Sequence, residues 1–171
     1  MEKIKIQLKD GAVREFNSGI ALYDIAQSLS RSLAKSAMLG KVDGQYVDLN
    51  YQLYQDAQVE FLTFDDLEGK SVLRHSAAHI LAQAVKRLYP DVKLGIGPSI
   101  ENGFYYDFDT THPFTPEDLL KIQKEMEKIV QENLPFEKID ISRSEAIELF
   151  SKTGEQYKVE LINDLPEDAL I

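Results

Sequence analysis

Two of the three histidines in this 171-residue sequence stand four positions apart, as His75 and His79 in the stretch HSAAH. The surrounding residues have the apolar spacing of a helix, in which each residue turns by about 100°, so the two imidazoles would share one face. An imidazole titrates near neutral pH, and it can bind a metal ion, hold a water molecule or transfer a proton. The pair is therefore the feature of the sequence best suited to chemistry.

Three interpretations of this pair stay open from its spacing alone. The first is an exposed helical face with two incidental histidines, and the second is acid–base or orienting chemistry. The third is a zinc site, which needs at least one more protein ligand. The sequence has no cysteine, so that ligand would be a carboxylate or His112, which a polar turn places at the surface. The glutamate of the metalloprotease motif H-E-x-x-H is also absent. The apolar stripe of the helix centres near Ala84, almost opposite the histidines, so they are not expected in its main packing face.

Two further stretches could contribute to a site. GIGP (95–98) lacks the G-K-[ST] of a phosphate-binding loop, so Gly95 and Gly97 indicate a close backbone approach beside the histidines. FYYDFD (104–109) predicts a strand with Phe104, Tyr106 and Phe108 on one face. Aromatic burial is the simpler interpretation of that face, although a tyrosine hydroxyl could point into a groove.

The first 62 residues form one predicted domain. IKIQL alternates apolar and polar residues, and the turn at Asp10-Gly11 leads into AVREF. A short amphipathic helix around Leu22–Leu29 follows, then a strand pair around Asp43-Gly44 and a last strand at QVEFL. This order of hairpin, helix and strands predicts a β-grasp, ubiquitin-like domain over 1–62, which serves binding or spacing because it contains no reactive group.

Residues 63–71 (TFDDLEGKS) are polar and rich in turn formers, so we expect a linker there, followed by an α+β domain over 72–171. The elements expected in that domain are a helix over about 73–88, a hairpin around Asn102-Gly103, a helix from Thr115 to about Leu134, a strand near 136–142, and a helix over about 144–151 with Gly154 behind it. The tail shows no terminating signal, and we expect the chain to end before this domain does.

The composition is ordinary for a globular protein, with 43% hydrophobic and 28% charged residues. No apolar run approaches the length of a membrane span, and no signal peptide is evident. The absence of cysteine excludes disulfides and thiolate metal sites and fits a cytoplasmic protein. Residues 63–171 carry 12 basic and 21 acidic side chains, which argues against nonspecific nucleic-acid binding by this part alone.

The stretch RHSAAHILAQAVKRLYPDVKLGIGPSIENGFYYDFD resembles the start of the second N-terminal domain of bacterial threonyl-tRNA synthetases. Its H-x-x-x-H, G-I-G-P and G-F-Y-Y-D-F elements come in the order and spacing of that family. The first 62 residues resemble the TGS domain that opens those enzymes, so the resemblance covers essentially the whole chain. It implies the N-terminal region of a threonine–tRNA ligase, with an editing domain related to that of alanyl-tRNA synthetases.

The resemblance also implies an activity and its residues. In this family the editing domain hydrolyses seryl-tRNA made in error, an aminoacyl-ester hydrolysis. His75 and His79 match the H-x-x-x-H pair, which helps bind the terminal adenosine and position the water, and Lys158 matches a lysine of the editing pocket. Tyr106 stands where an aromatic residue lines that pocket, beside the substrate-facing backbone expected at Gly95 and Gly97. Which residue is the general base stays open.

The sequence departs from the family after NDLPED, because the C-x-x-x-H element that completes the editing pocket is not in this chain. We therefore expect little or no editing by the chain alone, and no metal, although alanyl-type domains bind zinc at these four positions. ATP, Mg²⁺ and a catalytic zinc belong to the aminoacylation core of the full-length enzyme. The resemblance implies tRNA as partner, no membrane, a monomeric chain and a homodimeric full-length enzyme. The alternative is a noncatalytic RNA- or protein-binding module built on the TGS domain.

Overall fold

The computed structural model describes residues 2–135, 137 and 139–171 of the chain. The chain forms two compact units, Met1–Arg74 and His75–Ile171. Each unit has a hydrophobic core of its own. Among the described residues, no helix combines the length and the apolar character that crossing a membrane would need.

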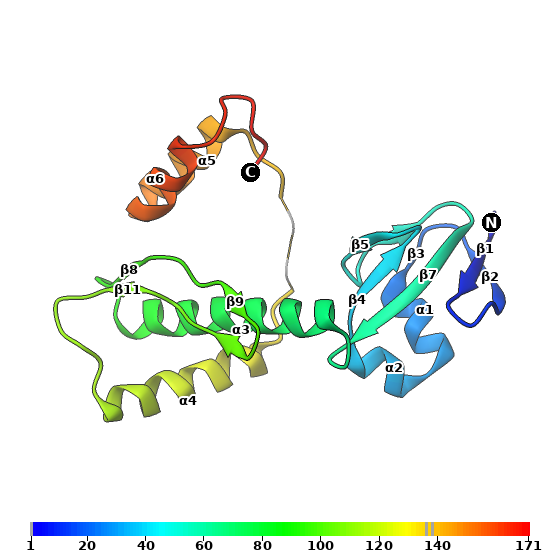
Figure 1. The fold of residues 1–171 in the computed structure, drawn as a ribbon, viewed down its shortest axis with the longest axis horizontal. Coiled ribbons are helices and arrows are strands. Elements are labelled where there is room, and N and C mark those ends of the chain that lie inside the picture. Colours follow the sequence, from blue (N-terminus) through cyan, green and yellow to red (C-terminus); the bar gives the residue numbers. More distant parts are fainter. Residues whose placement is uncertain (1, 136, 138) are drawn as a thin grey trace. The chain divides into compact units, whose positions relative to one another are not determined.

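The first unit is a five-stranded sheet with the strand order β2-β1-β7-β4-β5, packed against two helices (Figure 1). Its elements are β1 (Lys3–Leu8), β2 (Val13–Asn17), β3 (Ile20–Ala21), α1 (Leu22–Leu29), α2 (Arg31–Ser36), β4 (Ala37–Val42), β5 (Gln45–Val47), β6 (Gln52–Leu53) and β7 (Ala57–Thr63). The central strands β1 and β7 run parallel, whereas β1–β2, β4–β7 and β4–β5 are antiparallel. This arrangement confirms the predicted β-grasp fold.

Local sequence explains this unit well. The alternation in β1 buries Ile4 and Ile6 under Leu22 and Ile25 of α1, as a half-buried strand and an amphipathic helix require. The turn between β4 and β5 has positive φ at both Asp43 and Gly44, which is the type I′ geometry that an Asp-Gly pair favours. The short elements α2, β3 and β6 were not predicted, because two to six residues give too little periodicity to recognise.

The stretch 63–71, which we expected to be a linker, is largely ordered secondary structure. Thr63 ends β7, and its backbone N–H donates to the Asp66 carboxylate at 2.7 Å in a turn that leads into helix α3 (Leu67–Leu88). A methyl group on Gly69 would lie 1.8 Å from the carbonyl oxygen of Thr63, so the first turn of α3 can lie against the strand end only because this position is glycine. The boundary between the compact units falls inside α3, between Arg74 and His75.

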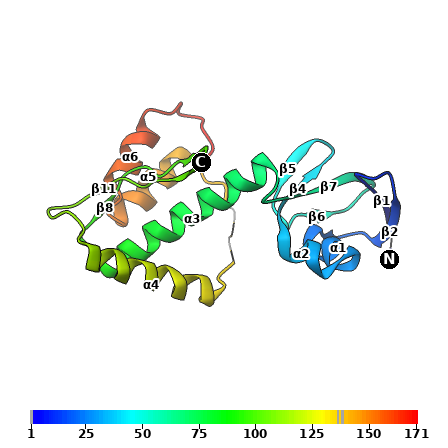
Figure 2. The ribbon, with the colours of Figure 1, turned by 60° about the horizontal axis from the view of Figure 1, so that its bottom comes forward.

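The second unit combines helices with two small antiparallel strand pairs, which confirms the α+β class. After α3 come β8 (Lys93–Leu94), β9 (Ser99–Ile100), β10 (Gly103–Phe104), β11 (Phe108–Asp109), α4 (Pro116–Glu132), α5 (Arg143–Lys152) and α6 (Gln156–Asn163). Strand β9 pairs with β10 across the predicted Asn102-Gly103 hairpin, and β8 pairs with β11. Helices α3 and α4 enclose the core, and α5 and α6 lie together beside β8 and β11 (Figure 2).

Helix α3 is covered on more than one side. Ala84, the centre of the predicted stripe, is fully buried against α4, and so is Val85, which the stripe did not include. Ala78 and Ala82, which lie toward the histidine face, are buried as well, whereas Leu73 of the predicted stripe is 40% exposed. A second layer therefore covers the flank of the helix that leads to His75 and His79.

The helix boundaries in the second unit follow the capping signals. The Thr115 side chain accepts from the Asp118 backbone N–H, and the Asp118 carboxylate accepts from the Thr115 N–H at 3.1 Å, which is a capping box. Helix α4 ends at Glu132, two residues before the predicted limit, because Asn133 takes the left-handed conformation. Helix α5 matches its prediction, and Gly154 follows it with φ of +73°.

The C-terminal segment differs from prediction. Of the strand expected near 136–142, residues 136 and 138 lie outside the described residues, and the others that the structure describes make only a single bridge, between Ser142 and Leu170. Helix α6 was not predicted at all. It has no side-chain cap at Glu155, so the sequence carries none of the usual signals for its start.

Candidate functional site

The two histidines lie one turn apart on α3 and contact each other. Their Nε2 atoms are 3.0 Å apart, and the rings meet edge to face with centroids 4.5 Å apart. One Nε2 must carry a hydrogen and the other must accept it, so the pair shares one hydrogen bond. Both side chains reach solvent and neither belongs to the core, as the helical geometry predicted.

His79 lines a groove of about 370 Å³ in the second unit. Its walls come from four parts of the chain: α3, β8, the segment between β10 and β11, and α6. The lining residues are His79, Ala82, Gln83, Lys86, Arg87, Leu94, Tyr106 and Lys158. The groove thus brings together three of the residues selected from the sequence, namely His79, Tyr106 and Lys158, with His75 in contact with His79.

Tyr106 forms one wall of the groove, and Gly97 allows its position. The Tyr106 ring is edge to face with His79, with centroids 6.5 Å apart, and it stacks on Phe108 at 5.1 Å. A methyl group on Gly97 would lie 2.1 Å from Cδ2 of Tyr106. The ring can therefore occupy this place only because residue 97 has no side chain.

Gly95 has a different position from Gly97. Its N–H donates to the Asp107 carbonyl at 2.8 Å, and the Asp107 N–H donates to the Ile96 carbonyl at 2.9 Å. Gly95 lines a separate hollow of about 590 Å³ with residues of β11 and α6. It fixes the backbone on which the Tyr106 segment runs, and it does not line the groove.

Burial and neighbouring charges shift the pKa values of His79 and Tyr106 in the groove. Partial burial lowers the pKa of His79, and the charges of His75 and Lys158 lower it further. His79 is therefore neutral at pH 7. Burial raises the pKa of Tyr106, with a contribution from the Glu155 carboxylate, so Tyr106 stays a phenol.

Glu155, beside the groove, was not selected from the sequence. Glu155 is only 7% exposed, and its oxygens lie 3.5 Å from Lys86 Nζ and 3.8 Å from Lys158 Nζ. Lys86 was also not selected, although it lines the groove on the histidine face of α3. A glutamate three residues before a lysine is common on exposed helices, so the local sequence gives no sign that Glu155 is buried.

The remaining histidine lies elsewhere. His112 is exposed in the turn before α4, where its carbonyl accepts a hydrogen bond from Thr110 Oγ1 at 3.0 Å. It lines a separate hollow, of about 520 Å³, beside Tyr89 and Asp118. Within residues 2–135, 137 and 139–171, no three histidine, aspartate or glutamate side chains gather where they could hold a metal ion.

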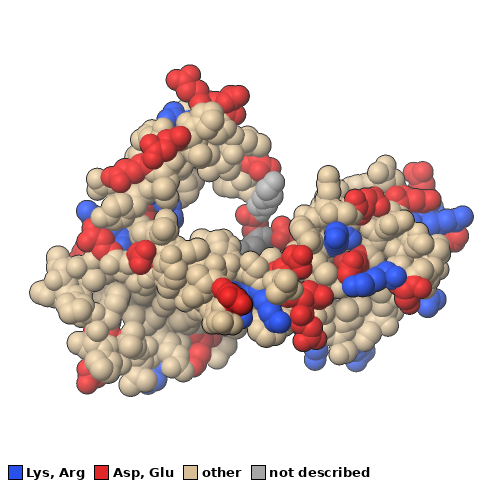
Figure 3. All heavy atoms as spheres, in the orientation of Figure 1, with Lys and Arg blue, Asp and Glu red and all other residues tan. Residues whose placement is uncertain are grey.

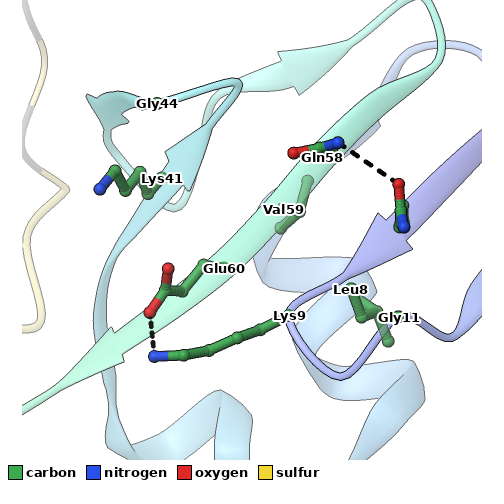
Figure 4. Close-up of a pocket in the computed structure, with 9 residues that line it drawn as sticks. Leu8, Lys9, Gly11, Lys41, Gly44, Gln58, Val59 and Glu60 are labelled. Atoms are coloured by element: carbon green, nitrogen blue, oxygen red, sulfur yellow. Dashed lines mark hydrogen bonds and ion pairs between the residues drawn. The ribbon is translucent and has the colours of Figure 1, made fainter.

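Figure 4 shows another hollow, on the sheet of the first unit. It measures about 350 Å³ and lies over β1, β4 and β7. Its Lys9 pairs with Glu60, and Gln58 donates to Gln7 at 3.4 Å. The described residues that line it include no histidine, and the Glu60 carboxylate is already paired. This hollow offers hydrogen-bonding groups but nothing to activate a water molecule, so the groove at His79 is the better candidate for chemistry.

Comparisons with known proteins match the first unit to one domain family and nearly the whole chain to one kind of enzyme. Residues 4–63 match the TGS domain family, so the β-grasp unit carries a TGS domain. Over 168 residues, or 98% of its length, the chain is homologous to threonine–tRNA ligases. It is 58% identical to the ligase of Desulforamulus reducens, 55% to that of Acetivibrio thermocellus and 52% to that of Clostridioides difficile. The chain spans about a quarter of the length of these relatives, 26% in each case. The resemblance noted in the sequence is thereby confirmed.

Proposed function

We propose that this chain is the N-terminal region of a threonine–tRNA ligase, which joins threonine to its tRNA with ATP, and that the groove at His79 hydrolyses seryl-tRNA made in error. The observation that carries the second part is the grouping of the His75–His79 pair, Tyr106 and Lys158 around one groove. The homology to threonine–tRNA ligases supports the first part.

A ligase for threonine needs such an activity for a physical reason. Serine lacks only the methyl group of threonine, and a site that admits threonine gains about 1–3 kcal/mol from one such group. That difference corresponds to roughly 10–200-fold selectivity, which is less than protein synthesis requires. A second, hydrolytic site that admits the smaller product corrects the remainder.

The reaction is attack of a water oxygen on the carbonyl carbon of the ester that joins serine to the terminal ribose. The bond from that carbon to the ribose oxygen breaks, the ribose oxygen takes up a proton as water loses one, and the products are serine and free tRNA. The imidazoles of the pair can hold the water and carry its proton, and the lowered pKa of His79 favours a neutral ring there. The Lys158 ammonium can stabilise the negative charge that develops on oxygen in the transition state.

The groove carries more positive charge than the surface around it, and this charge suits binding of the end of a tRNA. Figure 3 shows acidic side chains gathered over α5 and α6 on the face in view, and residues 63–171 carry an excess of acidic side chains. The groove instead is lined by Lys86, Arg87 and Lys158. Arg87 is held by Glu132 at 2.6 and 2.8 Å, whereas Lys86 and Lys158 share the single carboxylate of Glu155 and keep a net positive charge for a ribose–phosphate chain.

The test is deacylation of seryl-tRNA for threonine in single turnover, with this chain and with a form extended by about twenty residues to include the C-x-x-x-H element that the family implies. We expect the extended form to hydrolyse the ester and this chain to be much slower. In the full-length ligase, His79→Ala should abolish hydrolysis and leave threonylation intact. An extended form that binds tRNA but leaves the ester unchanged would favour the noncatalytic binding module instead.

A further inference from the structure

Glu155 is the one buried charged residue among those that the structure describes. It stands at the start of α6, directly after the glycine that ends α5, and its side chain is 8% exposed. Its Oε2 atom is buried and accepts no hydrogen bond from the described residues. Burying a carboxylate with an unfilled oxygen costs free energy, so its presence calls for a role other than packing.

The Glu155 carboxylate lies between two lysines of the groove. Oε1 is 3.5 Å from Lys86 Nζ on α3, and Oε2 is 3.8 Å from Lys158 Nζ on α6. Each lysine has one further contact, since Lys86 Nζ donates to the Val92 carbonyl at 2.9 Å and Lys158 Nζ lies 5.0 Å from the centre of the Phe150 ring. Both side chains are about one third exposed, at 31% and 33%, and both residues line the groove.

We infer that Glu155 is a positioning residue, which holds the ammonium groups of Lys86 and Lys158 against the groove wall and so places positive charge where the aminoacyl ester binds. This inference rests on the proposed hydrolysis for its catalytic consequence. One carboxylate between two ammonium groups leaves a net positive charge on the wall. Without the carboxylate the two cations repel each other, and their long side chains can turn out to solvent.

The charge of Glu155 matters in this inference more than its shape. Glutamine has the same size and keeps the hydrogen-bonding carbonyl, but it cannot neutralise either lysine. Glu155→Gln therefore separates positioning by charge from simple filling of space. Glu155→Asp keeps the negative charge but places it one methylene further from the lysines. This variant should therefore lose less hydrolysis than Glu155→Gln. Glu148→Gln on α5 is the matched control, because Glu148 is 66% exposed and pairs only with Lys152 among the described residues.

The first measurement is single-turnover hydrolysis of seryl-tRNA by the full-length ligase. We expect Glu155→Gln to slow hydrolysis by roughly tenfold or more, as loss of a charged contact in the transition state would. Glu155→Asp should be intermediate, Glu148→Gln unchanged, and threonylation unaffected in all three. Equal rates for Glu155→Gln and Glu148→Gln would overturn the inference.

The second measurement is a histidine NMR titration of the chain, which needs no activity. The other charged or titratable groups around the carboxylate are Lys86 of α3, Lys158 of α6 and Tyr106. Without Glu155 the Lys158 charge is uncompensated, so the His79 pKa should fall further in Glu155→Gln and stay unchanged in Glu148→Gln. An unshifted His79 titration in a folded Glu155→Gln chain would also overturn the inference.

Two outcomes separate this inference from the proposed function and from a folding role. If the full-length ligase hydrolyses no seryl-tRNA, the proposed function fails, and the His79 titration alone decides on Glu155. If Glu155→Gln unfolds the second unit, the rate of hydrolysis by Glu155→Asp decides between positioning and a folding role. Slower hydrolysis by a folded Asp variant with normal thermal stability supports positioning, and a wild-type rate overturns it.

Discussion

The ring of Tyr106 lies directly over the backbone of Gly97, at a place where an added methyl group would come within 2.1 Å of its Cδ2 atom. The same ring meets His79 edge to face and stacks on Phe108. The position of one wall of the groove therefore depends on a glycine that does not itself carry a reactive group.

Gly97→Ala should displace Tyr106 and slow hydrolysis of seryl-tRNA in the full-length ligase. Overpacking of this kind costs about 1–3 kcal/mol, and the ring can avoid it only by leaving the groove wall. The measurement is single-turnover deacylation beside thermal unfolding. If the effect passes through Tyr106, the double variant Gly97→Ala with Tyr106→Ala will be no slower than Tyr106→Ala alone; additive losses would contradict this route.

The stability of the second unit should rise with pH through the titration of His79. Its pKa in the folded chain is below the ordinary value, so between the folded pKa and about 6.5 the unfolded chain binds more protons than the folded one. Stability is therefore reduced at acid pH and regained as the pH rises through this window. The free energy of unfolding, measured between about pH 5 and pH 8, should rise less steeply in His79→Gln than in the wild type. Identical slopes would mean that His79 titrates alike in both states.

Lys158→Met should raise the His79 pKa. The Lys158 charge is one of the causes that lower this pKa, after burial and the charge of His75, and methionine removes the charge while it keeps most of the length of the side chain. Lys152→Met is the control, since Lys152 lies on α5 with its side chain 70% exposed and pairs with Glu148. Histidine NMR should show a shift for the first variant only. A shift of equal size in both would point to long-range charge instead of contact across the groove.

Thr115→Ala should destabilise the second unit by about 1 kcal/mol, the usual cost of losing a side-chain N-cap. Thr115 and Asp118 form the capping box of α4, and Asp118 also accepts a hydrogen bond from Tyr89 at 2.8 Å. Chemical denaturation followed by a probe in the second unit measures the loss. The matched variant Thr111→Ala removes the same atoms from an exposed residue of the preceding turn, and it should change stability little. A loss of equal size in both variants would rule out the cap as the cause.

The hydrogen bonds that the Asp118 carboxylate accepts from Thr115 and Tyr89 lower its pKa. Its contribution to stability is present above its unfolded pKa and is lost as the pH falls toward the folded value. The Thr115→Ala defect should accordingly shrink in acid. A defect that stays constant down to the acid transition would show that the hydrogen bonds to Asp118 are not its source.

Much of the fold could be predicted where one or two residues decide a conformation. Asp43-Gly44 fixes a hairpin, Thr115 with Asp118 fixes the start of α4, and Gly154 follows the end of α5. The stretch 63–71 misled because its glycine and acidic residues suggest a flexible linker. In the structure the same residues build a turn and the first part of α3, and the contact of Gly69 with Thr63 becomes visible only once the strand end is placed.

The site was partly predictable for a similar reason. Helical spacing alone put His75 and His79 together on the face opposite the core, and the structure confirms that placement. Tyr106 and Lys158 could be selected only through the resemblance to a family, because both reach the groove from elements distant in sequence. Glu155 could not be selected from the sequence. Its burial depends on how α6 packs against α3, and local residue spacing does not predict that packing.

Helix α3 supplies His75, His79, Ala82, Gln83 and Lys86 from successive turns of a single rigid rod. Inserting or deleting one residue between His75 and Lys86 would swing everything behind it by about 100° around the axis. The groups behind the change would then turn away from the groove. Substitutions in α3 keep the directions of the other side chains, whereas insertions and deletions change them. The number of residues in α3 should therefore vary far less among relatives than the identity of those residues.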